Sequence, residues 1–223
     1  MDQDELSFRR SIVAMATTRR WGATPQRLDD DSARERLLAA AGRCIIRRGD
    51  TQIRMAEVAD EARVARSTVY RYFATRDDLL LGLVLERVDA ALTRWVASLQ
   101  RPFDAASSIR ELILKPVAAV ADGDPLNRAL YASESTALTS TLEVGAEPLV
   151  DLMMTHFEPL LAEWIADGQL HPDLEIRDTV HWMYVTTTFL LTPSWRHRPA
   201  ATQLRFVDRY LLRALLREPV AGA

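Results

Sequence analysis

Apolar residues recur three or four positions apart through most of the 223-residue chain, which is the spacing of one face of an α-helix. No stretch shows a convincing alternation of apolar and polar positions, so no strand is predicted. Ser32 with Glu35 and Ser108 with Glu111 have the spacing of a capping box, in which each side chain bonds the other residue's backbone N–H. The pattern predicts helices at 32–48, 55–62, 66–73, 75–100, 108–121, from 124–125, and at 148–167, 176–191 and 200–216.

Two of these helices, 55–62 and 66–73, are short, are joined by a tight break, and lie between longer helices. This order is typical of a helix-turn-helix, whose second helix enters the major groove of DNA. Val69 and Phe73 lie one turn apart and define the buried side of the second helix. Its opposite side is rich in groups that hydrogen-bond base edges and phosphates. These exposed positions are Arg66, Ser67, Thr68, Arg71 and Tyr72.

The organisation along the chain follows from this order of helices. We expect an all-α protein with an N-terminal extension at 1–30, a helix-turn-helix DNA-binding domain at 31–80, and a larger helical domain at 81–223. The boundary falls inside a long helix rather than in a flexible linker. The two domains should therefore move as coupled rigid bodies.

The stretch from Glu57 to Leu79 resembles the TetR/AcrR-like family of bacterial repressors. The resemblance covers about residues 34–80 and is most specific in Val69-Tyr70-Arg71-Tyr72-Phe73, which the cation Arg76 follows. It implies phosphate contacts by the tyrosines and Arg76 and base contacts by the start of the second helix. Arg54, at the start of the first short helix, is a further candidate for a phosphate. The DNA-binding residues expected are Arg54, Arg66, Ser67, Thr68, Tyr70, Arg71, Tyr72 and Arg76.

Three positions depart from that family's pattern. Arg54 stands where a helix-capping threonine is usual. Arg63 stands where a turn glycine is usual, and Arg is a poor residue for left-handed backbone. Ala65 stands where a serine cap is usual. These departures leave open a second interpretation. In it the chain is a helical ligand-binding or scaffolding protein whose helix-turn-helix no longer binds DNA. Operator binding distinguishes the two.

The resemblance also implies that the larger domain holds a ligand pocket. Large side chains are frequent there, and walls rich in aromatic residues and Met suit an apolar or aromatic small molecule. The alternative is that they are ordinary core residues. The candidates for ligand contact are Met153, Phe157, Trp164, Trp182 and Phe189.

A homodimer interface is the second expectation for the larger domain, because a palindromic operator needs two reading heads. Two helices carry apolar stripes, which in two copies would form a four-helix bundle. The alternative is that both stripes pack inside one subunit. The interface residues expected are Ile176, Val180, Met183, Thr187, Leu190, Leu204, Val207, Leu211 and Leu215.

Charge is unevenly distributed between the two ends. Residues 1–80 hold 15 basic and 13 acidic side chains, a net of +2, whereas residues 81–223 hold 13 and 18, a net of −5. The basic end is the one that would face a phosphate backbone. Its N-terminal extension carries five cations, which would suit an arm that binds DNA. The alternative is a solvated tail. The five cations are Arg9, Arg10, Arg19, Arg20 and Arg27.

Other classes of function lack their signatures. The sequence has no glycine-rich phosphate loop, no GxSxG elbow, no HExxH and no paired cysteines, so no catalytic residue, metal or cofactor is expected. The single cysteine, Cys44, and the lack of a long apolar run favour a cytoplasmic protein without a membrane span. We expect a non-enzymatic, ligand-responsive transcriptional regulator, a repressor that binds a palindromic operator as a dimer and is released by a small molecule. The sequence does not distinguish repression from activation.

Overall fold

The computed structural model describes residues 25–99, 104–121, 123, 125–131 and 146–217. Within these ranges every regular element is helical, and the β-type pairing is limited to an isolated bridge between Leu170 and Leu216. The all-α fold is therefore confirmed. The predicted DNA-binding arm falls mostly outside the described residues, which exclude its cations at positions 9, 10, 19 and 20.

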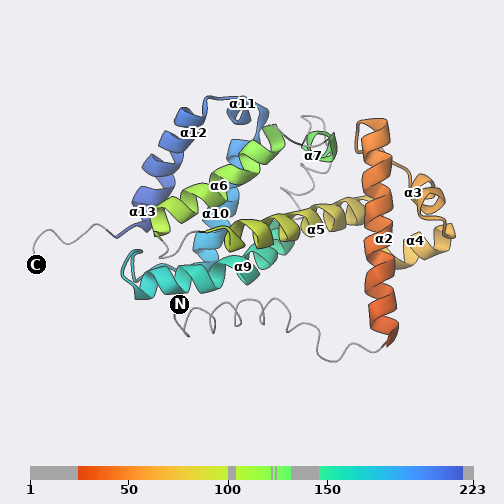
Figure 1. The fold of residues 1–223 in the computed structure, drawn as a ribbon, viewed down its shortest axis with the longest axis horizontal. Helices are drawn as coiled ribbons and strands as arrows, with labels where there is room; N and C mark the ends of the chain where they lie inside the picture. Colours follow the sequence, from red (N-terminus) through yellow and green to blue (C-terminus); the bar gives the residue numbers. More distant parts are fainter. Residues whose placement is uncertain (1–24, 100–103, 122, 124, 132–145, 218–223) are drawn as a thin grey trace, which may run out of the picture.

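The N-terminal part is a helix-turn-helix braced by two long helices (Figure 1). It consists of α2 (Pro25–Arg48), α3 (Met55–Ala62) and α4 (Arg66–Tyr72), followed by α5 (Arg76–Ala97). The predicted bounds of the two short helices hold to within one residue. However, α2 begins well before Ser32, which therefore lies inside the helix and does not cap it.

Local chemistry explains where these helices start and stop. Gly49 ends α2 with a φ of +81°, a left-handed conformation that glycine adopts without steric cost. At the start of α5, the Thr75 hydroxyl accepts from the Asp78 N–H at 3.1 Å, and the Thr75 N–H donates to the Asp78 carboxylate at 2.9 Å. This is the capping box that stops α4 from running into α5.

The larger domain consists of the remaining helices. Its elements are α6 (Ala105–Ala121), α7 (Pro125–Leu130), α9 (Ala146–Ala166), α10 (Ile176–Leu191), α11 (Pro193–Arg196), α12 (Ala200–Phe206), the π-helical η2 (Val207–Leu212) and α13 (Arg213–Leu215). Asp104 caps α6 by accepting from the Ser107 N–H at 2.8 Å, so the Ser108–Glu111 pair lies inside that helix and is not its cap.

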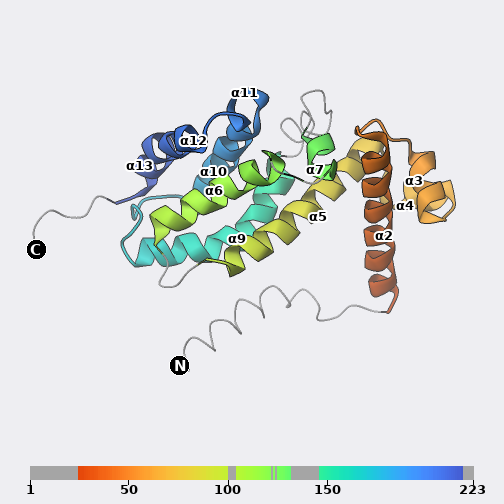
Figure 2. The ribbon, with the colours of Figure 1, turned by 45° about the horizontal axis from the view of Figure 1, so that its top comes forward.

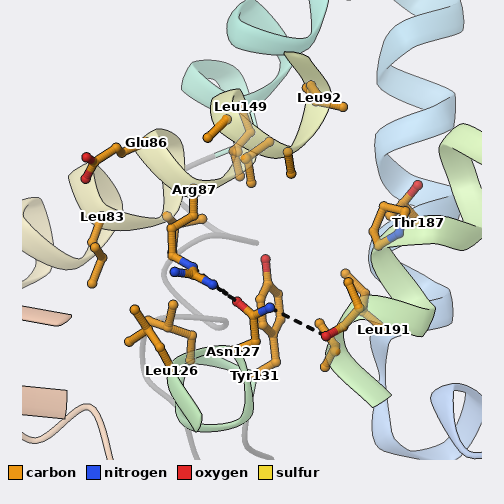
Figure 3. Close-up of a pocket in the computed structure, with 18 of the residues that line it drawn as sticks. Leu83, Glu86, Arg87, Leu92, Leu126, Asn127, Tyr131, Leu149, Thr187 and Leu191 are labelled. Carbon is orange, nitrogen blue, oxygen red and sulfur yellow. Dashed lines mark hydrogen bonds between the residues drawn. The ribbon is translucent and has the colours of Figure 1, made fainter. Parts of the chain in front are cut away.

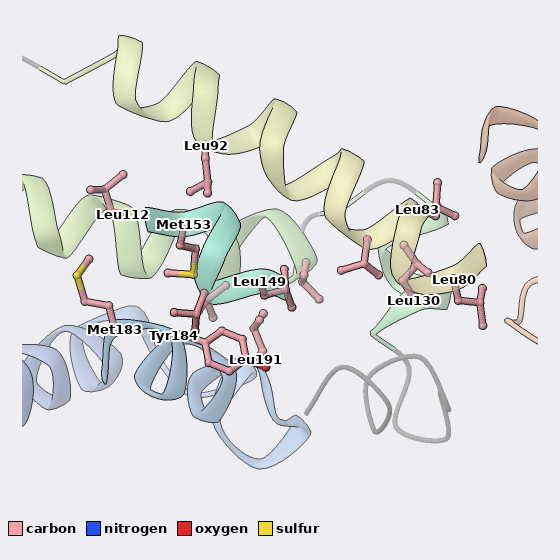
Figure 4. Close-up of a cluster of buried hydrophobic side chains, with 14 of the residues drawn as sticks. Leu80, Leu83, Leu92, Leu112, Leu130, Leu149, Met153, Met183, Tyr184 and Leu191 are labelled. Atoms are coloured by element: carbon pink, nitrogen blue, oxygen red, sulfur yellow. The ribbon is translucent and has the colours of Figure 1, made fainter. Parts of the chain in front are cut away.

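The long helix α5 joins the two parts without a break. In both orientations of the ribbon it runs from α3 and α4, the two short helices called the reading helices below, into the larger domain (Figures 1 and 2). Its apolar side packs against α9, α6 and α2. Leu80, Leu83 and Leu92 of α5 lie in a continuous buried cluster with residues of α9 and α10 such as Met153 and Met183 (Figure 4). The fold is therefore a helix-turn-helix joined by one long helix to a larger helical domain, as predicted.

Candidate DNA-binding surface and ligand cavity

The turn between α3 and α4 has the geometry of a helix-turn-helix. Val58 and Ala59 of α3 are fully buried, and the Val64 N–H donates to the Ala59 carbonyl at 3.0 Å, which closes the end of α3. Arg63 adopts φ 57° and ψ 48°, the left-handed conformation for which glycine is usual. The tight turn is therefore formed despite the arginine.

The second helix, α4, presents its predicted face to solvent. Val69 and Phe73 are buried at 0% and 3% exposure, so the positions between them point outward. The expected DNA-binding residues all belong to this exposed side or its rim. Arg54, Arg66, Ser67, Tyr70 and Arg71 are exposed, and Thr68, Tyr72 and Arg76 are half-buried.

Two of the expected phosphate ligands have intramolecular partners. The Tyr72 hydroxyl donates to the Asp30 carboxylate of α2 at 2.7 Å and accepts from Arg71 Nη2 at 2.9 Å. Arg76 donates to the Gln52 side chain at 2.9 Å and to the adjacent Asp77. These bonds hold the side chains of α4 and α5 in place at the edge of the reading helix.

Other cations on this surface have no acidic partner within the described part of the chain. These are Arg54, Arg63 and Arg66, which surround the start of α4. By contrast, Arg43 and Arg47 of α2 hold Glu61 of α3 at 2.6 and 2.9 Å. Hydrogen bonds from Arg43 and Arg47 lower the pKa of Glu61 below its usual range. The surface therefore combines an ion-paired brace between α2 and α3 with unpaired charge beside α4.

A cavity of about 500 Å³ lies where the two domains meet. Its walls come from α5, α6, α7, α9 and α10, and also from Leu38, Gly42 and Ile46 of α2. Most of the lining is aliphatic or aromatic. The volume falls within the usual range of small-molecule sites, about 300–1,000 Å³. Because α2 also supports α3, a molecule in this cavity would contact the helix on which the reading helices rest.

The five residues predicted to contact a ligand divide into two groups. Met153 and Phe157 line the cavity. Trp164 is buried elsewhere in the core, and Trp182 and Phe189 are on the opposite side of α10 from Tyr184 and Leu191, which do line it. Those three residues do not line this cavity, because a large side chain on an amphipathic helix does not reveal which side faces a cavity.

Sequence reasoning missed the polar end of the cavity. Arg87 of α5 donates through Nε and Nη2 to the Asn127 amide oxygen of α7, at 3.1 and 2.8 Å (Figure 3). Tyr131 lies beside this pair, and burial raises the pKa of its hydroxyl, an effect that the Arg87 charge opposes. Burial also raises the pKa of Glu86, with the nearby Glu35 adding to the rise. A signal was available, since Arg87 sits among apolar neighbours of a helix predicted to be buried on that side.

Most of the predicted dimer stripe lies inside the subunit. Six residues are between 0% and 3% exposed and belong to the core of the chain itself, which supports the alternative that these stripes pack within one subunit. They are Val180, Met183, Leu190, Val207, Leu211 and Leu215. Thr187 lines the cavity, Ile176 is half-buried, and Leu204 is 37% exposed. For these six residues, the prediction that they lie in a dimer interface is therefore corrected.

A different apolar face of α10 is exposed. Trp182, Val185 and Phe189, spaced for one side of the helix, are 47%, 40% and 39% exposed. Phe189 contacts Phe206 with ring centroids 5.3 Å apart, and Phe206 contacts Tyr210 at 5.0 Å. The exposed strip therefore continues from α10 across α12 to η2.

In the described ranges, no helix is both long and apolar enough to cross a membrane. A search of the same ranges finds no group of three or more His, Cys, Asp or Glu side chains placed to hold a metal ion.

Comparison with known proteins gives one family. Residues 37–83 match the family described as bacterial regulatory proteins, tetR family. An uncharacterized HTH-type transcriptional regulator of Mycobacterium bovis is 30% identical over 118 residues, which are 52% of this chain and 58% of the relative. A similar regulator of Mycobacterium tuberculosis matches equally. The chain thus spans little more than half the length of these curated relatives.

Solved structures share the fold at low sequence identity. A complex of RolR with its ligand resorcinol matches with a TM-score of 0.60 and 16% identity, over 86% of this chain and 91% of that one. FadR of Bacillus subtilis in complex with stearoyl-CoA matches with a TM-score of 0.53 and 19% identity, over 80% and 95%. A TetR-family regulator of Haemophilus influenzae matches with a TM-score of 0.54 and 17% identity, over 85% and 99%.

Proposed function

Because residues 37–83 match the family of bacterial regulatory proteins described as tetR, we propose that the chain is a regulator of that family, a ligand-responsive repressor that binds a palindromic operator as a homodimer. A small molecule in the cavity releases it from DNA. The observation that carries the proposal is the exposed face of α4, where Arg66, Ser67 and Tyr70 are free to meet a DNA groove. The curated relatives of this chain are transcriptional regulators, which supports a function other than catalysis.

In this proposal the roles on DNA follow from position on the reading surface. Arg66, Ser67 and Thr68 at the start of α4 read base edges, since an arginine can donate two bonds to a guanine. Tyr70, Arg71 and Arg54 contact phosphates and set the register. Tyr72, bonded to Asp30 and Arg71, orients Arg71 as well as reaching the backbone itself.

The test is operator binding measured by fluorescence anisotropy with the upstream region of the gene, over a series of salt concentrations. Arg66→Ala should weaken specific binding by about 5- to 100-fold, because a bidentate arginine–guanine contact is worth roughly 1–3 kcal/mol. Arg213→Ala, which removes an exposed cation at the far end of the chain, is the matched control and should bind as the wild type does. Equal binding by both variants would exclude α4 as the reader.

Release by ligand is proposed to run through α7. Asn127 of this helix bonds Arg87 in the cavity wall, and the neighbouring Leu126 packs on Gly42 of α2. A ligand that favours another position of α7 would thereby favour another position of α2 and of the reading helices. Coupling of this kind is reciprocal, so operator DNA should weaken ligand binding by the factor by which ligand weakens operator binding.

A second copy of this chain is the proposed occupant of the exposed strip of α10 and η2. Isolated apolar residues are common on surfaces, but a contiguous aromatic strip is typical of an interface. Val185→Asp should therefore shift the protein to monomers in light scattering and weaken operator binding. Ala162→Asp, on the exposed side of α9, adds the same charge outside the strip and should remain dimeric. A Val185→Asp protein that stays dimeric would place the interface elsewhere.

A further inference from the structure

The cavity has an apolar body and one polar end. Leu83, Leu92 and Leu149 contribute to the apolar walls, whereas Arg87 extends from α5 toward Asn127 on the opposite side (Figure 3). The guanidinium is partly buried and its Nε and Nη2 both donate to a single amide oxygen. That oxygen belongs to a neutral group, and Asn127 Nδ2 in turn contacts the Ala119 carbonyl at 3.5 Å.

Charges around the cavity favour an anion. Among the lining residues, three are arginines, namely Arg43, Arg87 and Arg94, and one, Glu86, is acidic. Arg43 is paired with Glu61 outside the cavity. Glu86 points to the other side of α5 from Arg87 (Figure 3). Arg87 is the arginine that Figure 3 shows extending across the cavity toward Asn127, and the carboxylate of Glu86, although close enough to interact with its charge, points away from that end.

Tyr131 adds a second hydrogen-bond donor at the same end. Burial raises the pKa of its hydroxyl, so the group stays protonated at neutral pH and can donate. Figure 3 shows its ring beside Asn127, with the hydroxyl directed toward the cavity. A guanidinium on α5 and a phenol just after the end of α7 are suited to the two oxygens of a carboxylate.

We propose that the cavity binds an amphipathic monocarboxylate, with the carboxylate on Arg87 and Tyr131 and an apolar chain or ring against the leucines. The proposal rests on the proposed function and names the ligand class of that same cavity. An ionised carboxylate accepts hydrogen bonds from a guanidinium more strongly than a neutral amide does, so it replaces Asn127 as the acceptor. Asn127 is then released from Arg87, and the α7 contact that leads to α2 changes.

The experiment is isothermal titration calorimetry of the full-length protein at neutral pH, which measures the dissociation constants of matched probes. Octanoate and 4-butylbenzoate are compared with 1-octanol and 4-butylbenzyl alcohol, which keep the apolar part and lack the charge. We expect each carboxylate to bind the wild type about tenfold or more tightly than its alcohol, as charge-assisted hydrogen bonds imply. Equal affinities, or failure of both carboxylates to bind, would overturn the proposal.

Variants show which residue binds the carboxylate of the probe. Arg87→Met should remove the preference for carboxylate while leaving the alcohols bound, and Arg87→Lys, which keeps the charge without the planar fork, should retain part of it. Arg128→Met removes an exposed cation from the same helix as Asn127 and is the matched control. If Arg128→Met loses the preference as fully as Arg87→Met does, the carboxylate does not lie at Arg87. Thermal unfolding of each variant confirms that it is folded.

Operator binding separates this proposal from the proposed function. If carboxylates bind through Arg87 but leave operator affinity unchanged, the proposed ligand class is supported. The proposal that a ligand in this cavity releases the operator is then excluded. If alcohols and carboxylates bind equally and both release the operator, release stands and the ligand class is overturned.

Discussion

Gly82 is a residue at which α5 approaches the helix-turn-helix domain closely. A Cβ at this position would lie 2.9 Å from Phe73 Cε1 and 2.9 Å from Arg34 Nη2. Gly82→Ala should destabilise the protein, because forcing atoms into a packed core costs about 1–3 kcal/mol, whereas the helix gains only about 1 kcal/mol from alanine. Chemical denaturation measures the difference.

Gly42→Ala is the matched control for this prediction, since Gly42 is also in a helix. Its Cβ would meet only the end of the Leu126 side chain, at 3.3 Å, which can turn aside more easily than the buried Phe73 ring. A Gly82→Ala protein that is as stable as Gly42→Ala would show that Phe73 is free to move.

Arg63 carries a backbone cost that glycine would not. With φ at 57°, a side chain with a Cβ costs roughly 1–2 kcal/mol relative to the preferred region. Arg63→Gly should therefore raise the free energy of unfolding by about 1 kcal/mol, partly offset by the greater freedom of glycine in the unfolded chain. Arg63→Ala removes the same charge but keeps the Cβ, and should show no such gain in a denaturant titration.

At the scale of elements, α4 is the least well capped helix of the reader. Its N-cap is Ala65, with no side-chain hydrogen bond, whereas at the start of α5 the Thr75 hydroxyl accepts from the Asp78 N–H and the Asp78 carboxylate accepts from the Thr75 N–H. Ala65→Ser should stabilise the protein by about 0.5–2 kcal/mol, the usual worth of such a cap. Thr75→Ala should cost a similar amount. Thermal melting of the two variants in parallel tests the pair, and equal melting temperatures would contradict it.

The brace between α2 and α3 makes stability depend on pH. Hydrogen bonds from Arg43 and Arg47 lower the folded-state pKa of Glu61, so its contribution is fully present above the ordinary glutamate pKa, about 4.3. It is lost as the pH falls through the lower folded value, because the unfolded chain takes up the proton first. Glu61→Gln should thus be less stable than the wild type at neutral pH, and the gap should narrow in acid.

Denaturation at a series of pH values measures that gap. In an Arg43→Gln background, where the first of the two donors is missing, the narrowing should be smaller. A gap that is constant with pH would show that the pairs do not persist in solution.

Helix spacing predicted elements better than it predicted their orientation. The bounds of α3 and α10 follow from apolar periodicity, and Val69 with Phe73 correctly gave the exposed side of α4. On α10, however, both sides carry large apolar residues, so periodicity cannot say whether Val180 or Trp182 faces the core. The short α11 was missed, because a helix of one turn has no period to detect. Arg87 meets Asn127 across 40 positions of sequence, a contact that local patterns do not contain.

At the scale of the whole molecule, α7 connects the cavity to the reader. Leu126 packs toward α2, whereas Leu130 on the same helix is buried beside the cavity. Leu126→Ala should reduce the ratio of ligand affinities measured without and with operator, because residues between two sites modulate coupling by about 0.5–2 kcal/mol. Leu130→Ala is the control: it should change ligand affinity while preserving more of that ratio. Titrations of each variant with and without DNA give the two ratios.

The position of α2 has a consequence for how such a protein diversifies. One helix contributes Leu38, Gly42 and Ile46 to the cavity wall and carries on another side the residues that hold α3. A mutation on this wall that admits a new molecule therefore also disturbs the support of the reading helices. In the repressor proposed above, a new ligand specificity that arises through α2 should therefore be accompanied by weaker repression without ligand, and second mutations that restore repression should map to the junction of α2 with α3.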